Sequence, residues 1–173
     1  MIHAVCETTN LRAVHYAERI FDCVCDVDID NGTIGYMDGL ADGYSHIYNF
    51  KTGLKDGAVI VLAHNPEWTE DTSNRLNQRK DKFFIPAGTP FRAFVLRVTD
   101  EFALSAEGFA GGEPEVGMSV AVNAEGKLAV NGEDGAFVGK IMRKRQVGST
   151  LVTGVREYGY ARMMYTVKVE AMA

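Results

Sequence analysis

The sequence has no long hydrophobic run. Its longest apolar stretches, such as residues 58–63, are far shorter than the roughly 18–20 residues that a membrane-spanning helix needs. The N-terminus also lacks the basic segment followed by an apolar run that marks a secretory signal. Hydrophobic residues make up 46% and charged residues 24% of the 173 residues, as in an average globular protein. We therefore expect a soluble, folded protein with no membrane partner, made in a cytoplasm.

An excess of basic residues is also missing. The chain has 18 Lys and Arg against 23 Asp and Glu, a net charge of -5. Because nucleic-acid binders usually present a basic face, we expect no direct nucleic-acid partner. One basic cluster allows two interpretations, a solvated strand edge protected from unwanted pairing or a contact with an acidic protein surface. It consists of Lys140, Arg143, Lys144 and Arg145.

Cysteine is scarce and odd in number. Cys23 and Cys25 lie too close along one extended strand to pair without strain, so we expect these two and Cys6 to be reduced thiols. A zinc site is not indicated, because structural sites normally place about two to four residues between their cysteines. The Cys-x-Cys spacing predicts instead that both side chains point into a core.

No sequence motif assembles a catalytic, metal or cofactor site. Residues 26–37 superficially resemble a calcium loop, but Asn31 occupies the sixth position and Met37 the twelfth, where Gly and Glu are needed. Residues 135–140 resemble a phosphate loop that is one residue too short, with Ile141 in place of a Ser or Thr. No Gly-x-Ser-x-Gly elbow occurs. We expect neither enzymatic activity nor a cofactor.

Period-two patterns predict a mainly β protein. In residues 21–30, apolar side chains alternate with aspartates, which indicates a half-buried strand with a solvated aspartate face. Asn31-Gly32 then predicts a hairpin with a return strand over residues 33–38. Further strands are predicted over the following ranges: 58–63, 83–85, 91–99, 102–105, 118–123, 127–130, 135–145 and 163–171.

Composition changes predict the domain organisation. Residues 1–20 contain few apolar repeats and are expected to form an extended N-terminal arm, ordered by a partner. Residues 21–107 are predicted as a β-rich domain, and the glycine-rich residues 108–114 as a linker. Residues 115–173 are predicted as a small β-barrel. We therefore expect two small, strand-based, barrel-like domains.

Several segments resemble capsid decoration proteins, also called head-stabilising or cement proteins, of tailed phages that infect Firmicutes. The similarity covers most of residues 10–107 in the order and character of VDIDNG (27–32), IYNF (47–50), NPEWTED (65–71), NQRKDK (77–82) and IPAGTPFR (85–92). The C-terminal turns are similar to the small barrel of several phage capsid accessory proteins. They include VGMSV (116–120), GKL (126–128) and VGK (138–140).

This resemblance implies a non-enzymatic virion protein on the outer capsid surface. Such a protein binds the major capsid protein, often as a homotrimer at three-fold positions, and stabilises the shell by bridging coat subunits. It brings no catalytic residues. A cement protein needs a rigid scaffold together with an arm or loop that crosses a subunit boundary. Besides the arm, the polar residues 65–82 are expected to form a long ordered loop. In the arm and this loop, the residues that we predict to contact the capsid or a neighbouring subunit are Leu11, Arg12, Tyr16, Trp68 and Arg79.

Two alternative functions come from other classes. Loop aromatics on a strand scaffold suggest a carbohydrate-binding module, which would need an exposed Trp68 or Tyr160 beside polar groups. A hydrolase with a site built from separated residues would need His46, His64 and an aspartate to meet in one cleft. Both alternatives depend on the tertiary structure.

Overall fold

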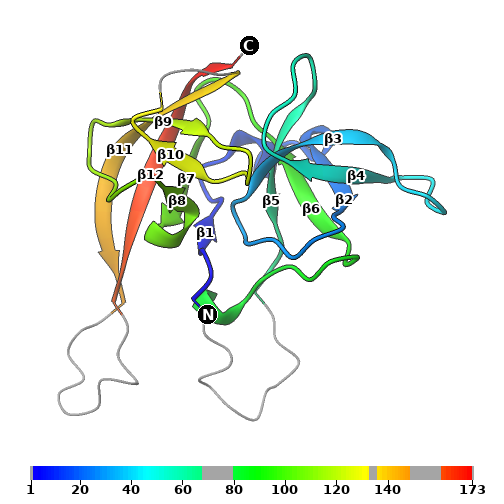
Figure 1. The fold of residues 1–173 in the computed structure, drawn as a ribbon, viewed down its shortest axis with the longest axis horizontal. Helices are drawn as coiled ribbons and strands as arrows, with labels where there is room; N and C mark the ends of the chain where they lie inside the picture. Colours follow the sequence, from blue (N-terminus) through cyan, green and yellow to red (C-terminus); the bar gives the residue numbers. More distant parts are fainter. Residues whose placement is uncertain (1, 68–79, 133–135, 149–160, 173) are drawn as a thin grey trace, which may run out of the picture.

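A computed structural model describes residues 2–67, 80–132, 136–148 and 161–172 (Figure 1). The structure is mainly β, as predicted, with a closed barrel and a second sheet side by side (Figure 1). The described helices are short 3-10 turns, η1 (Arg12–His15), η2 (Ala17–Arg19), η3 (Lys80–Lys82) and η4 (Ala106–Gly108). None of the helices in these ranges has the length and hydropathy needed to cross a membrane.

Five strands form the closed barrel. They are β2 (Ile20–Val24), β3 (Ile34–Leu40), β4 (Ile47–Thr52), β5 (Ile60–His64) and β6 (Phe91–Val95), in the order β2-β4-β3-β5-β6. The barrel closes because β2 pairs with β4 in parallel and with β6 in antiparallel orientation. Inward-facing side chains fill it, including Cys23, Phe50, Val61 and Phe91.

Seven strands form the second sheet. They are β1 (Cys6–Glu7), β7 (Glu101–Ser105), β8 (Phe109–Ala110), β9 (Ser119–Val122), β10 (Leu128–Val130), β11 (Phe137–Val147) and β12 (Arg162–Met172). Their order is β1-β7-β12-β11-β9-β10-β8. Apart from β1, which precedes the barrel strands, the chain therefore passes from the barrel to the second sheet between β6 and β7. The predicted linker, residues 108–114, contains β8, which pairs with β10.

The predicted hairpin at Asn31-Gly32 is wrong, because β2 ends at Val24 and pairs with β4 and β6 rather than with β3. Asn31 is buried. Its Nδ2 donates to the carbonyl of Asn65, which follows β5, and its Oδ1 accepts the Asn65 N–H. Gly32 has φ +89°, and a Cβ there would meet Leu104 at 2.2 Å. These two residues therefore pack against other elements instead of joining neighbouring strands.

The extended N-terminal arm is not confirmed. The backbone of β1 pairs with β7, with Cys6 opposite Leu104 and Glu7 opposite Ala103. The buried apolar residues of this segment are Ala4, Val5, Cys6, Leu11 and Ala13. A strand that completes a sheet and fills a core is held by its own chain and needs no partner for order.

One hydrophobic core is shared by the barrel and the sheet. Ile34, Leu62 and Phe94 come from the outer side of the barrel, and they pack in the same cluster as Phe102 and Tyr165 of the sheet. Cys6, Leu11 and Ala13 of the N-terminal segment belong to the same cluster. The two sheets are therefore parts of one packed body.

Candidate functional site

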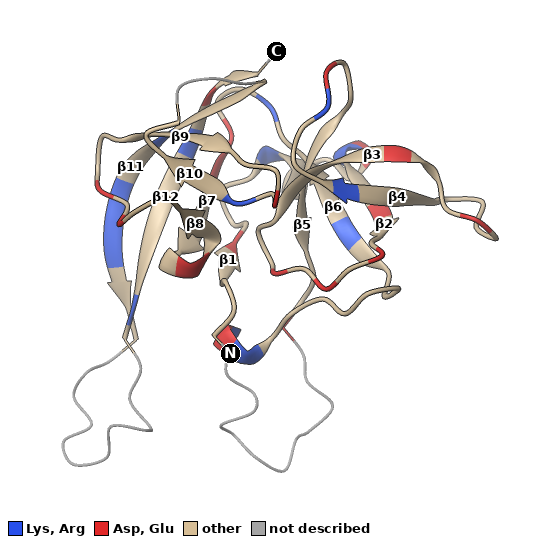
Figure 2. Cartoon of the chain, in the orientation of Figure 1, with Lys and Arg blue, Asp and Glu red and all other residues tan. Residues whose placement is uncertain are grey.

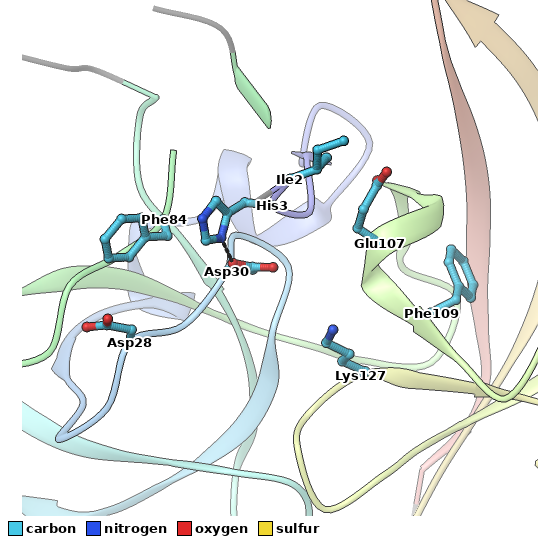
Figure 3. Close-up of a pocket in the computed structure, with 8 residues that line it drawn as sticks. All are labelled: Ile2, His3, Asp28, Asp30, Phe84, Glu107, Phe109 and Lys127. Carbon is cyan, nitrogen blue, oxygen red and sulfur yellow. Dashed lines mark hydrogen bonds and ion pairs between the residues drawn. The ribbon is translucent and has the colours of Figure 1, made fainter. Parts of the chain in front are cut away.

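A cleft of about 690 Å³ lies where the N-terminal segment, the barrel and the sheet meet (Figure 3). Five separate segments line it. The N-terminal segment and the loop after β2 supply one side, and the chain from η4 to β10 supplies the other (Figure 3). The lining residues are Ile2, His3, Asp28, Asp30, Phe84, Glu107, Phe109 and Lys127.

His3 and Asp30 form the best-defined contact of the cleft. His3 Nδ1 lies 2.7 Å from Asp30 Oδ1, and the Ala4 N–H donates to Asp30 Oδ2 at 3.0 Å. The His3 ring stacks on Phe84 with ring centroids 5.0 Å apart. Because both carboxylate oxygens are engaged, Asp30 holds the N-terminal segment against the barrel. The alternation of residues 21–30 predicts a solvated strand face for Asp30, so this contact is not predicted by the sequence.

The opposite wall carries a carboxylate and an amine. Glu107 Oε2 accepts a hydrogen bond from Ser105 Oγ, and this hydroxyl in turn accepts the Val5 N–H at 3.0 Å. The Lys127 side chain extends toward the cleft (Figure 3), and its amine has no ion-pair partner within the described residues. The lining thus offers groups of both charges to a polar ligand, but no hydroxyl or thiol nucleophile.

The histidines of the hydrolase hypothesis occupy different surroundings. His46 lies in the exposed turn between β3 and β4, where Nδ1 is 3.3 Å from Ser45 Oγ. His64 ends β5 and packs edge-on against Phe94, and burial lowers its pKa despite the nearby Glu67 carboxylate. Within the described ranges, no three His, Cys, Asp or Glu side chains form a group that would hold a metal ion.

All three cysteines are free and buried, and the sequence predicts the free thiols and the burial of Cys23 and Cys25. Burial raises the pKa of the Cys23 thiol to about 12, with a smaller contribution from the Asp22 carboxylate. The pKa of Cys6 is raised further, again mainly by burial. Since the thiolate is the reactive form of cysteine, these residues serve as small core side chains.

The predicted contact residues are not gathered in one place. Leu11 is fully buried in the shared core, so its side chain is not available to a partner in this structure. Arg12 and Tyr16 are exposed, and the guanidinium of Arg19 lies 5.2 Å from the centre of the Tyr16 ring. Trp68 and Arg79, and also Tyr160 of the carbohydrate hypothesis, lie outside the described residues.

A β-bulge gives the predicted basic cluster its geometry. Ile141 pairs with Val167 and Arg143 with Thr166, so Met142 is an extra residue on β11. A bulge of this kind shifts the alternation of the following side chains. Arg143 and Arg145 therefore share a face with Thr166, opposite the buried Val167, whereas Lys144 lies over the ring of the buried Tyr165.

The face that Arg143 and Arg145 share is basic. Lys140 and Lys168 pair with each other on that face, next to Glu101. We call Lys140, Arg143, Arg145 and Lys168 the basic outer face. It lies on β11 and β12, at the side of the molecule away from the barrel (Figure 2). The sequence identified the charges of β11, but the bulge that orients them has no sequence signature.

Comparison with known proteins adds no relative. The chain matches no protein-family model, no curated protein sequence and no solved structure. The resemblance to capsid decoration proteins therefore stays a prediction.

Proposed function

We propose that this chain is a non-enzymatic virion protein that binds the outer surface of a tailed-phage capsid and bridges coat subunits. The observation that carries the proposal is a rigid body with two exposed surfaces of different chemistry at its opposite ends. A bridging protein needs such an arrangement, because each end must contact a different subunit while the body between them transmits the load.

The first surface is the β3–β4 hairpin, which projects from the barrel (Figure 1). Leu40 is 51% exposed and Tyr44 is 47% exposed. The hairpin is nevertheless ordered, because the Ala41 N–H donates to the Ile47 carbonyl at 2.8 Å and the Asn49 amide donates to the Leu40 carbonyl at 3.2 Å. Apolar side chains held in solvent on a defined hairpin favour contact with a partner.

The second surface is the basic outer face, at the other end of the molecule from that hairpin (Figures 1 and 2). The shared core of barrel and sheet lies between these two surfaces. Close-packed interiors have low compressibility and transmit strain, which suits a protein that resists expansion of a shell. Many copies on one particle also gain from avidity, so each contact can be weak. The proposed assembly is a homotrimer on the major capsid protein.

Co-sedimentation with purified phage heads that lack accessory proteins tests this function. We expect saturable binding with a fixed number of copies per coat subunit, and no binding to dispersed coat protein. Replacing Leu40 and Tyr44 by Ser should weaken binding about tenfold or more, which corresponds to ~1.4 kcal/mol. The matched control replaces Val98 and Val116, which are exposed elsewhere, and should bind normally. Absence of binding to heads would overturn the proposal.

A carbohydrate-binding role is the second candidate, and the lining of the cleft favours it. The rings of Phe84 and Phe109 lie among the carboxylates of Asp28 and Glu107, which is the combination of apolar and hydrogen-bonding groups that a sugar requires. A glycan array separates the two roles. Specific glycan binding that is lost in Asp28→Asn would favour this candidate, and silence across the array would remove it.

A further inference from the structure

A second, smaller pocket of about 230 Å³ lies on the same side of the sheet as the basic outer face. We infer that Arg143, at the rim of this pocket, binds a carboxylate side chain from an extended acidic segment of a partner protein, and that this segment pairs with the free edge of β11. This inference does not depend on the partner being a capsid. The pocket is lined by Glu7, Thr9, Asn10, Phe102, Ala103, Arg143, Arg145 and Thr166.

The strand register builds this pocket. Glu7 of β1 is opposite Ala103 of β7, Ala103 is opposite Thr166 of β12, and Thr166 is opposite Arg143 of β11. The row therefore crosses four strands, with the two short side chains of Ala103 and Thr166 between Glu7 and Arg143. Because Ala103 and Thr166 are small, a space remains above them between Arg143 and the N-terminal segment.

The two arginines of the pocket have different partners. Arg145 forms an ion pair with Glu7, which holds its guanidinium over the small side chains. Arg143 is exposed and has no ion-pair partner in the part of the chain that the structure describes. A free guanidinium beside a paired one leaves the pocket with a net positive charge. The planar guanidinium of Arg143 can bind a carboxylate through two parallel hydrogen bonds.

The edge of β11 indicates a peptide rather than a free anion. Its ladder with β9 covers Val138–Lys140, and the Ile141 backbone bonds Met118 and Gly117. Beyond Ile141, residues 142–147 pair only with β12 among the described residues. Such a strand presents unpaired N–H and C=O groups that an extended segment can bind. The unpaired charge of Arg143 selects an acidic segment and repels a second basic strand, whereas Lys144 and Arg145 are already paired with Glu113 and Glu7.

Titration of the full-length chain with a synthetic peptide of alternating Glu and Val tests this inference. We expect saturable binding by calorimetry, with NMR shifts at the backbone amides of residues 142–147 and no binding of a Lys and Val peptide. Arg143→Gln should weaken binding about tenfold at ~50 mM salt. Arg143→Lys should recover only part of the affinity, because it restores the charge without the planar fork.

Lys144→Gln is the control, since Lys144 lies on the opposite face of the same strand, over the Tyr165 ring, and is already paired with Glu113. It should retain most of the peptide affinity. Equal losses in Arg143→Gln and Lys144→Gln would show general charge attraction and overturn the role of Arg143 as the carboxylate site. Binding of inorganic phosphate without the peptide would overturn the peptide assignment, and no binding of either probe would overturn the whole inference. Unchanged melting temperatures would show that each variant is folded.

Discussion

Leu11 and Val14 are three residues apart and both aliphatic, yet only one of them is buried. Leu11 has no exposed surface and belongs to the core shared by barrel and sheet, whereas Val14 is 41% exposed. The sequence predicts a partner contact for Leu11. The burial of Leu11 gives this residue a structural role instead, and the two roles predict different effects of a substitution on stability.

Leu11→Ala should lower the free energy of unfolding by about 2–5 kcal/mol, because it leaves a cavity in a close-packed core. Val14→Ala should change it by less than about 0.5 kcal/mol, because exposed positions tolerate truncation. Urea unfolding followed by circular dichroism measures both. Similar small effects of the two substitutions would mean that the N-terminal segment does not pack as described, and would return it to the role of an arm.

At the scale of elements, the turn between β9 and β10, both in the second sheet, makes hydrogen bonds to the barrel. The sequence predicts this turn over residues 123–126, and Asn123 Oδ1 accepts the N–H groups of Glu125 and Lys127 within it. The structure adds that the turn packs against the barrel. The Ile34 N–H donates to the Gly126 carbonyl at 2.8 Å, and Thr52 Oγ1 donates to the Ala124 carbonyl at 3.1 Å.

Gly126→Ala should therefore be more harmful than an equal change in a free turn. Gly126 has φ +78°, and a Cβ there would meet the Ile34 carbonyl oxygen at 2.4 Å. Gly43 has φ +81° with nothing within 4 Å, so Gly43→Ala isolates the backbone strain of about 1–2 kcal/mol. We expect Gly126→Ala to lose at least ~1 kcal/mol more in urea unfolding. Equal losses would contradict the contact between turn and barrel.

The whole molecule has two sheets but one main core. Leu62 of the barrel and Phe102 of the sheet lie in the same buried cluster. His3 and Asp30 also join the N-terminal segment to the loop after β2. Partners that share a core lose most of their buried apolar contacts if either one unfolds alone. The barrel and the sheet should therefore unfold together.

Calorimetry should show a single transition whose calorimetric enthalpy equals the van't Hoff enthalpy. Leu62→Ala, in the barrel, should shift this transition to lower temperature as a whole without splitting it. Hydrogen exchange provides a second readout, because amides of β5 and β12 should then exchange with similar free energies. Two separate transitions would show that the barrel and the sheet are independent domains.

Local properties of this protein were predictable from its sequence. Short segments that alternate or run apolar, bounded by turn residues, located most strands, including β5, β7, β9, β10, β11 and β12. Such patterns are read from neighbouring residues alone. The same reasoning predicted the burial of Cys23 and Cys25 and the turn before Lys127. Mainly β architecture follows from these elements.

Only the tertiary structure decided which strands are partners. Asn31-Gly32 predicts a hairpin locally, but the buried bonds from Asn31 to Asn65 stabilise a different path. The cleft around His3 joins segments from Ile2 to Lys127, and the pocket beside Arg143 joins segments from Glu7 to Thr166. No local pattern encodes contacts over such separations. Strand order, the shared core and both candidate sites arise from long-range packing, in which the burial of the whole chain outweighs local preference.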